Sequence, residues 1–279
     1  MSRSTRAATA QQTLDILERG NYQAPSGNIV SIAKAQQACE AGTVYYDVPD
    51  HAAVLASVQQ QLAEHSTTTT FEVVNQTTFA GVQGLLANGH SNIGCLNFAS
   101  AKNPGGGFLG GSQAQEEALS RASGLYPTLN KYFELYELNR KVKTCLYTHR
   151  MIYSPAVPVF RNDADELLES AYTTGIVTSA AVNAGVVRQR ESGSEEKIAE
   201  VMLERIERVL ALFHHHGHRD IVLGAWGCGV FRNAPADMAK LFAEHLRDGR
   251  YANAFETVRF SVLDRHGGRF IEPYQEVFG

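Results

Sequence analysis

Residues 93–117 read IGCLNFASAKNPGGGFLGGSQAQEE, an apolar run followed by a glycine-rich segment and a pair of glutamates. The apolar run at 93–99 predicts a buried strand. Five glycines follow within residues 103–112, and glycine lets the backbone turn with positive φ and bring its N–H groups close to a ligand. A surface loop without a ligand is the alternative. A strand that leads through such a loop into a helix is typical of α/β sheets, whose ligands bind at the carboxyl ends of the strands.

The helix that follows this loop is predicted to begin near Ser112. Ser112 can cap it, with Gln115 at the third helical position, as in a capping box. Glu116 and Glu117 then fall in or just after the first turn, where the helix dipole favours negative charge by about 0.3–1 kcal/mol. The dipole would explain both glutamates if they stood alone. They do not, because the glycine-rich loop delivers its ligand to this helix start.

A second glycine-rich segment, Gly224 to Asn233, follows a second apolar run at 221–223. Because ligands bind where loops leave the carboxyl ends of parallel strands, the two segments are expected to converge on one crevice. A diphosphate would fit one loop and a sugar the other. Phe231 either offers its face to a ribose or base or is a core aromatic. Cys228 shows no base partner, so it is assigned no catalytic role.

The rest of the chain alternates helices and strands, which predicts an α/β fold. The expected helices are 8–18, 52–62, 78–88, 126–139, 194–215 and 235–246, and the expected strands are 71–74, 151–153, 175–178, 221–223 and 257–263. This order predicts a twisted, mostly parallel or mixed sheet with helices on both faces. A polar break at 66–70 places a boundary between an N-terminal helical extension, 1–65, and a core, 66–279.

Composition excludes several classes of function. The 279 residues carry a net charge of −4, so a basic surface for nucleic acid is not expected. The apolar runs fall short of the ~20 residues that span a bilayer, and the N-terminus leads into an amphipathic helix rather than a signal peptide. The four cysteines are scattered without a Cys-x-x-Cys pair. This spacing argues against disulfides and a zinc knuckle and indicates a cytoplasmic location.

Two rival site patterns are weaker. His214, His215, His216 and His218 suggest a metal, but they lie at the C-terminal end of a helix, where the dipole favours cations. Gly105, Gly107 and Gly110 fit the dinucleotide pattern Gly-x-Gly-x-x-Gly. In that fold the glycines turn directly at the strand end, and a second strand carries an acid ~20 residues later. Here five residues separate the apolar run from Gly105, and the later region is helical in pattern, so the dinucleotide site is not favoured.

Three glycines (105–107), seven intervening residues and then Gln115-Glu116-Glu117 together resemble the signature of the poly(ADP-ribose) glycohydrolases. The flanking residues 97–104 and 224–233 resemble the bacterial-type branch. The resemblance implies a three-layer α/β/α macrodomain with a mixed central sheet, and an N-terminal helical extension packed on it. It also implies site residues: catalytic Glu117, Glu116 on the adjoining ribose, Asn103, Gly105, Gly106, Gly107 and Gln115 around the scissile bond, Gly227, Cys228, Gly229 and Val230 at the diphosphate, and Phe231 on the terminal unit.

The resemblance further implies hydrolysis of the ribose–ribose O-glycosidic bonds of poly(ADP-ribose), which releases ADP-ribose mainly from chain termini. One glutamate would act as general acid and then as base, without a metal or cofactor. The implied partners are poly(ADP-ribose) and ADP-ribosylated proteins in the response to DNA damage, with no membrane, no sequence-specific nucleic acid, and a monomeric chain. Two alternatives stay open: an ADP-ribose-binding macrodomain without activity, and a hydrolase of mono-ADP-ribosylated protein or nucleic acid. The paired glutamates favour the glycohydrolase.

Overall fold

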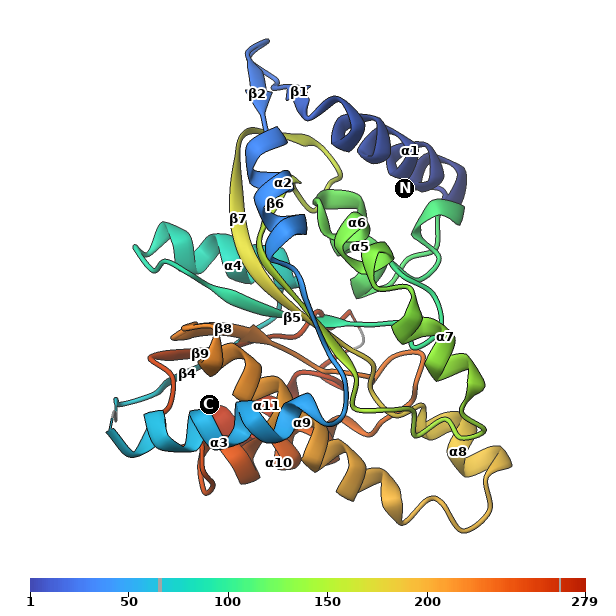
Figure 1. Ribbon diagram of the computed structural model, residues 1–279, viewed down its shortest axis with the longest axis vertical. Helices are drawn as coiled ribbons and strands as arrows, with labels where there is room; N and C mark the ends of the chain where they lie inside the picture. The colour runs from blue at the N-terminus through green and yellow to red at the C-terminus, as the bar shows by residue number, and fades with distance from the viewer. Residues whose placement is uncertain (65–66, 266) are drawn as a thin grey trace.

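A computed structural model describes residues 1–64, 67–265 and 267–279 (Figure 1). Its helices are α1 (Arg3–Arg19), α2 (Ala33–Gly42), α3 (Asp50–Glu64), α4 (Thr78–Ala87), α5 (Gln115–Ala122), α6 (Leu125–Lys131), α7 (Glu134–Lys141), α8 (Ala184–Arg190), α9 (Lys197–His215), α10 (Pro235–Leu246) and α11 (Glu272–Phe278). Its strands are β1 (Asn21–Gln23), β2 (Ile29–Ser31), β3 (Val44–Tyr46), β4 (Thr70–Val74), β5 (Gly94–Phe98), β6 (Met151–Arg161), β7 (Leu167–Ser179), β8 (Asp220–Leu223) and β9 (Thr257–Ser261).

The central sheet of the described chain has the strand order β3-β6-β7-β5-β8-β9-β4. Strands β7, β5, β8, β9 and β4 run parallel, whereas β6 is antiparallel to both of its neighbours. The prediction of a mixed sheet is therefore confirmed. Because β7, β5 and β8 are adjacent and parallel, the three loops that follow them leave the sheet at one edge.

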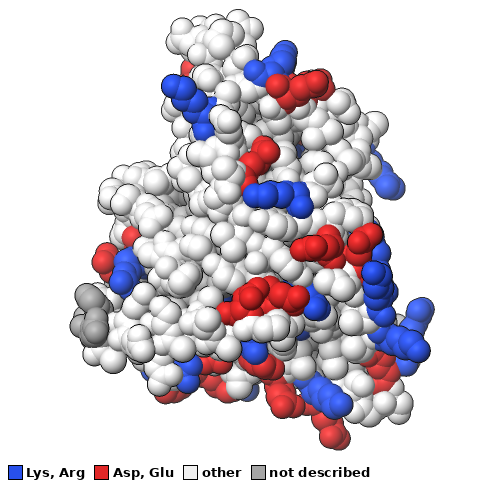
Figure 2. All heavy atoms as spheres, viewed as in Figure 1, with Lys and Arg blue, Asp and Glu red and all other residues white. Residues whose placement is uncertain are grey.

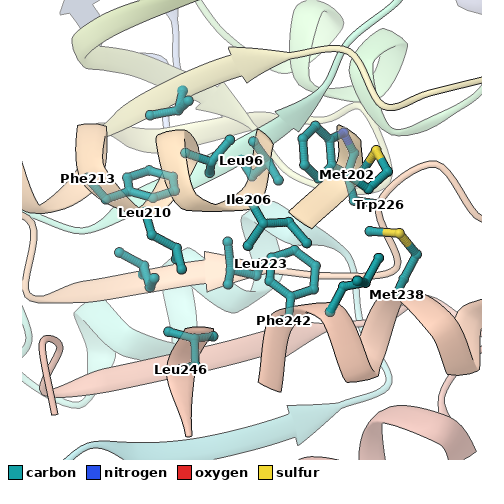
Figure 3. Close-up of a cluster of buried hydrophobic side chains, with 14 of the residues drawn as sticks. Leu96, Met202, Ile206, Leu210, Phe213, Leu223, Trp226, Met238, Phe242 and Leu246 are labelled. Atoms are coloured by element: carbon teal, nitrogen blue, oxygen red, sulfur yellow. The ribbon is translucent and has the colours of Figure 1, made fainter. Parts of the chain in front are cut away.

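Side chains alternate between the two faces of each strand and so build two cores. On β5, Cys95 packs with residues of α4, α5, α6 and α7, and its neighbour Leu96 packs with α3, α9, α10 and α11. Figure 3 shows the second of these cores, where α9 and α10 close over Leu96, Leu223 and Trp226. Each such apolar side chain, when fully buried, stabilises the fold by ~1.5–3 kcal/mol. The three-layer α/β/α prediction is confirmed.

The N-terminal segment makes two kinds of contact with these layers. Helix α1 and the β1–β2 hairpin pack through Ile16 and Tyr22 onto Phe160, far along the β6–β7 ribbon (Figure 1). Strand β3, in contrast, pairs with β6 as the edge of the central sheet, and α3 packs against α9. The proposed boundary at residues 65–66 lies outside the described residues, so the division into extension and core stays a prediction.

The predicted helices and strands lie close to the observed ones, with two differences of length. The strands expected at 151–153 and 175–178 are the ends of a much longer ribbon, β6–β7. The helical region at 126–139 forms two helices, α6 and α7. Within the described residues, no helix combines the length and hydropathy that a bilayer crossing needs.

Candidate active site

Three loops meet at the carboxyl edge of the sheet: residues 99–114 after β5, named here the first loop; residues 180–183 after β7; and residues 224–234 after β8, named the second loop. Hydrogen bonds connect them. The Ala99 N–H donates to Ser179 O (3.1 Å), and Trp226 Nε1 donates to the same carbonyl (3.2 Å). Asn233 Nδ2 donates to Val182 O (2.8 Å). The predicted convergence of the two glycine-rich loops is therefore observed.

Glycine is required where the first loop passes the paired glutamates. Gly105 and Gly106 have φ of +67° and +60°, in the left-handed region that side chains disfavour. A Cβ on Gly106 would lie 2.4 Å from Glu117 Oε1 and 3.2 Å from Glu116 Oε2. The loop can approach the two carboxyl groups this closely only because position 106 has no side chain.

The predicted cap at Ser112 is wrong. Helix α5 begins at Gln115, and Ala114 precedes it in an extended conformation without a side-chain cap. Ser112 belongs to the first loop instead, since its N–H donates to Gly107 O (3.1 Å). The Gln115 side chain fixes the helix start, because Nε2 donates to Leu96 O (2.8 Å) and Thr78 Oγ1 (3.0 Å) while Oε1 accepts from Phe98 N (2.9 Å). Its amide is thus engaged within the protein, and a contact to substrate stays a prediction.

Glu116 is buried, with 3% of its surface exposed. Its Oε2 accepts a hydrogen bond from Ser100 N (2.7 Å), and its Oε1 accepts one from Asn97 Nδ2 (3.2 Å). Burial, the largest cause, raises the pKa of Glu116 to about 8, because desolvation penalises the carboxylate. Asn97 Oδ1 has no partner among the described residues. Glu116 is therefore held rigidly and retains a proton near neutral pH.

Glu117 lies one position further along α5 and is only partly buried. Its Oε1 accepts a hydrogen bond from Gly107 N (3.0 Å), which fixes the carboxyl group on the first loop. Its Oε2 accepts no hydrogen bond from any residue that the structure describes. One oxygen is therefore positioned by the protein, and the other is available to a ligand.

The second loop exposes backbone amides instead of carboxylates. Gly227 has φ +73°, and a Cβ there would lie 2.5 Å from Asn233 Nδ2 and 2.6 Å from Ala181. Within the described chain, the N–H groups of residues 229–231 donate to no protein acceptor. Consecutive amides of this kind form a concave site for anions. Gly229 has open space around it, and Val230 is 79% exposed, so a ligand can reach these amides.

Cys228 and Phe231 lie in the same loop but differ in environment. Cys228 is buried, and burial raises the pKa of its thiol to about 12, which leaves it protonated and unreactive. Its N–H donates to Ala225 O (3.2 Å), so this amide is not open to a phosphate. Phe231 is partly buried and packs on the apolar core, with its ring also facing Tyr147.

Sequence reasoning missed Tyr147. It adopts φ +56°, a left-handed conformation that is rare for an aromatic residue. Its ring packs on Ala99, Ala101 and Ala180 at the starts of two loops, and it lies 6.1 Å from the Phe231 ring, centroid to centroid. Tyr147 therefore connects all three loops. Nothing in the pattern of residues 142–150 signals this role, because it depends on contacts distant in sequence.

The contact of helix α1 with the first loop is a second feature that the sequence did not reveal. Arg3 Nε donates to Gly110 O (2.9 Å), and Arg6 Nε donates to Gly111 O (2.8 Å). Thr13 Oγ1 donates to Arg121 O (2.6 Å) at the end of α5. Gly111 approaches α1 so closely that a Cβ would lie 2.0 Å from Arg3 O. The N-terminal helix thus supports the first loop from behind.

The histidine cluster takes part in structural contacts. His216 Nε2 pairs with Tyr46 OH (2.8 Å), and its ring stacks on Tyr153 at 3.5 Å, while His218 pairs with Tyr153 OH (2.8 Å). In the parts of the chain described, no group of three or more His, Cys, Asp or Glu side chains could hold a metal ion. Two surface hollows, of about 400 and 320 Å³, lie beside α8, α9 and α10 rather than over the glutamates.

A mixed sheet between two helical layers, with two glycine-rich loops at the carboxyl ends of its central strands, fits the macrodomain that the sequence resemblance implies. A comparison with protein families matches residues 10–162 to the microbial-type PARG catalytic domain, where PARG is poly(ADP-ribose) glycohydrolase. A comparison with curated protein sequences gave no match.

Solved structures similar to this chain agree with the family match. A mutant of the poly(ADP-ribose) glycohydrolase from Thermomonospora curvata is 41% identical, with a TM-score of 0.91, over 99% of this chain and 100% of that one. The same enzyme bound to the inhibitor ADP-HPD is 41% identical, with a TM-score of 0.89, over 98% of this chain and 99% of that one. The enzyme from Deinococcus radiodurans in complex with ADP-ribose is 41% identical, with a TM-score of 0.81, over 86% of this chain and 96% of that one. The chain belongs to the microbial-type poly(ADP-ribose) glycohydrolases, a family of glycosidases.

Proposed function

We propose that the chain hydrolyses the ribose–ribose O-glycosidic bonds of poly(ADP-ribose) and that Glu117 is its general acid and then its general base. One observation carries the assignment to Glu117. Its Oε1 is fixed by Gly107 N, whereas its Oε2 is open to a ligand. Glu116 lacks such an open oxygen, because both of its oxygens accept hydrogen bonds from buried protein groups. Of the pair, Glu117 is therefore the carboxyl group that can reach a scissile bond.

The chemistry needs one proton at a time. Glu117 Oε2 first donates a proton to the ribose oxygen that leaves, and the bond from this oxygen to the anomeric carbon breaks with its electron pair on the oxygen. The remaining ribose carries an oxocarbenium charge. Glu117, now a carboxylate, takes a proton from a water molecule that attacks the anomeric carbon. This step restores the protonated acid and releases ADP-ribose.

Glu116 supports this cycle without transferring a proton to the leaving group. Its pKa of about 8 keeps it largely protonated near neutral pH, so it adds little negative charge beside Glu117. Asn97 and Ser100 hold it at the base of the first loop. We assign Glu116 to positioning the ribose next to the scissile bond, with Asn103 and Gly105 to Gly107 forming the wall around it.

The second loop supplies the anchor for the terminal unit. The open amides at 229–231 suit a diphosphate, whose charge needs no basic side chain when consecutive N–H groups converge on it. Phe231 would pack on the sugar of the same unit. A terminal unit anchored in this way supports the proposal that ADP-ribose is released mainly from chain ends. The cytoplasmic location, the monomeric state and the partners, ADP-ribosylated proteins of the DNA damage response, stay predictions from the sequence.

The test compares the wild type with Glu117→Gln, a variant of nearly the same shape, on poly(ADP-ribosyl)ated protein, with EDTA present throughout. Free ADP-ribose is measured over time, and affinity for ADP-ribose is measured separately by calorimetry. We expect a loss of about hundredfold or more in kcat, with affinity retained, as for a general acid. Glu18→Gln, an exposed glutamate on α1, is the control and should keep full activity.

Three results would overturn the proposal. If the wild type binds ADP-ribose tightly but releases none from the polymer, the chain is a binding module. If Glu117→Gln retains activity while Glu116→Gln loses it, the roles of the two glutamates are reversed. Release only from mono-ADP-ribosylated protein would indicate the second alternative, a mono-ADP-ribosyl hydrolase.

A further inference from the structure

Four basic residues gather beside the first loop and form what we name the basic flank: Lys102, Arg140, Lys141 and Lys143. All four are exposed. None of them forms an ion pair with a carboxylate in the described part of the chain. Figure 2 shows basic side chains along the edge of the molecule where Figure 1 draws α7 and α8. In a chain with a net charge of −4, such a cluster is not expected from composition.

A hydrogen bond ties this flank to the candidate site. Arg140 Nη2 donates to Asn103 Oδ1 (3.1 Å), and Asn103 begins the glycine run that surrounds Glu117. The Arg140 guanidinium also lies over the Phe133 ring, 5.0 Å from its centroid, and Phe133 is 39% exposed. The arginine is thus held at the rim of the first loop with hydrogen-bond donors left for a ligand. Lys102 lies next to Asn103 in the chain.

The helix dipole explains only part of the flank. Arg140 and Lys141 lie in the last turn of α7, where cations are favoured. Lys102 lies in the first loop and Lys143 lies beyond the helix, so the dipole does not account for them. Acidic neighbours are Glu134 and Glu137 on α7 and Glu191, whose two oxygens accept hydrogen bonds from Thr144 Oγ1 and Cys145 N. These contacts engage Glu191 and fix the backbone that carries Lys143.

We propose that the basic flank is a second subsite, which binds the diphosphate of the ADP-ribose unit on the far side of the scissile bond. The inference rests on the proposed function. With the terminal unit on the second loop and its bond at Glu117, the rest of the polymer must leave across the first loop, and the flank lies at that rim. Each further unit brings an anionic diphosphate, which Arg and Lys side chains bind through charge-assisted hydrogen bonds.

The subsite acts on polymer but not on free ADP-ribose, which occupies the terminal site alone. Charge reversal in Lys141→Glu/Lys143→Glu should therefore raise KM for long polymer about tenfold and leave kcat and the inhibition constant of ADP-ribose unchanged. The dependence of polymer affinity on salt should also weaken, by about one unit of slope for each phosphate that the variant no longer neutralises. Lys34→Glu, a charge reversal at an exposed lysine on α2 away from the first loop, is the control and should change none of these values.

The experiment measures KM and kcat on long poly(ADP-ribose), inhibition by ADP-ribose, and direct binding of both ligands to each variant in the Glu117→Gln background. Weakened polymer binding with unchanged ADP-ribose binding supports the subsite. Equal polymer binding in the charge-reversed and Lys34→Glu proteins would overturn it. Binding is measured without turnover, so this outcome is separate from the proposed function: a wild type that binds polymer through the flank but releases no ADP-ribose would refute the activity alone.

Discussion

The two glycine-rich loops use glycine for opposite purposes. In the first loop, residues 99–114, most N–H groups are engaged within the loop or by Glu116 and Glu117, and the absence of a side chain at Gly106 admits the two carboxyl groups. In the second loop, residues 224–234, the amides at 229–231 stay open. The first loop therefore holds acids close to the backbone, and the second presents the backbone itself to an anion.

The contrast shows that glycine content alone does not define a phosphate site. Both loops are rich in glycine, and the sequence therefore predicts a ligand for each of them. The hydrogen bonds distinguish them: a loop whose amides are already engaged cannot bind phosphate through them, whatever its composition. Substitutions at matched glycines test this distinction, because the same added methyl group should impair catalysis in one loop and ligand affinity in the other.

Gly106→Ala should have the largest effect. The new Cβ would lie 2.4 Å from Glu117 Oε1 at a φ of +60°, so either the loop or Glu117 must move. Misplacement of a catalytic group by about 1 Å can cost about a hundredfold in rate, and we expect a loss in kcat of this size. Activity on poly(ADP-ribose) and thermal unfolding are measured together. Gly89→Ala, which also has a positive φ (+89°) but meets no atom within 4 Å and lies outside both loops, is the control, and equal losses of kcat in both variants would contradict the comparison.

Gly227→Ala should weaken binding instead of turnover. Its Cβ would meet Asn233 and Ala181 at a φ of +73°, and strain of ~1–3 kcal/mol would shift the second loop and its amides. We expect the affinity for free ADP-ribose to fall about tenfold or more while kcat at saturating polymer changes little. Calorimetry with ADP-ribose and steady-state kinetics separate the two constants. A fall in kcat with unchanged affinity would show that this loop positions the reacting bond.

The buried Glu116 should make stability depend on pH. Its folded-state pKa of about 8 lies above the ordinary value of 4.5, so the folded protein binds the extra proton between these values. The contribution of Glu116 to the free energy of unfolding is complete below the pKa of the unfolded chain and is lost as pH rises through 8. The slope is at most ~1.4 kcal/mol per pH unit. Glu116→Gln should therefore lose less stability than the wild type between pH 5 and 8, as measured by denaturant unfolding.

Four histidines act in the opposite direction and must be separated from this effect. Burial lowers the pKa values of His51, His149 and His216 to about 4, below the ordinary 6.5, and it also lowers the pKa of His218. The unfolded chain then binds more protons, so stability falls as pH drops from about 6.5 to 4. These residues are present in both proteins, so the difference between wild type and Glu116→Gln isolates the carboxyl group. A difference independent of pH would contradict the buried, protonated Glu116.

Much of the fold followed from the sequence, because the pattern of each element agrees with its place in the layers. The runs at 93–99 and 221–223 are apolar on both faces, as expected for central parallel strands. They form β5 and β8, respectively. The long β6–β7 ribbon did not follow. Pro155 and Pro158 argue against a strand. β6 accommodates Pro155 at a bulge between Ser154 and Val157, where Ala156 has φ +45°, whereas Pro158 stays in register opposite Thr173.

The residues of the candidate site could be predicted from the sequence, but the residues that hold its loops in place could not. The spacing of three glycines and Gln-Glu-Glu located the carboxyl groups, whereas the predicted Ser112 cap failed because a loop hydrogen bond to Gly107 competed for this segment. Tyr147 and α1 reach the site from elsewhere in the chain, and local patterns carry no information on such contacts. What the sequence could not supply is therefore mainly the set of residues that hold the two loops in place.

Removal of a contact between α1 and the first loop should have the smallest effect of these substitutions. It also distinguishes the two loops, because α1 donates hydrogen bonds to the first loop. Arg6→Ala removes the hydrogen bond from Arg6 Nε to Gly111 O, worth ~0.5–1.5 kcal/mol, and should lower kcat by about twofold to tenfold with ADP-ribose affinity unchanged. Arg19→Ala is matched in charge and helix, but Arg19 donates only to Asp15 O within α1. If both variants lose activity equally, α1 acts through overall stability. A loss confined to Arg6→Ala, which Arg6→Lys partly restores, would show that the helix positions the first loop.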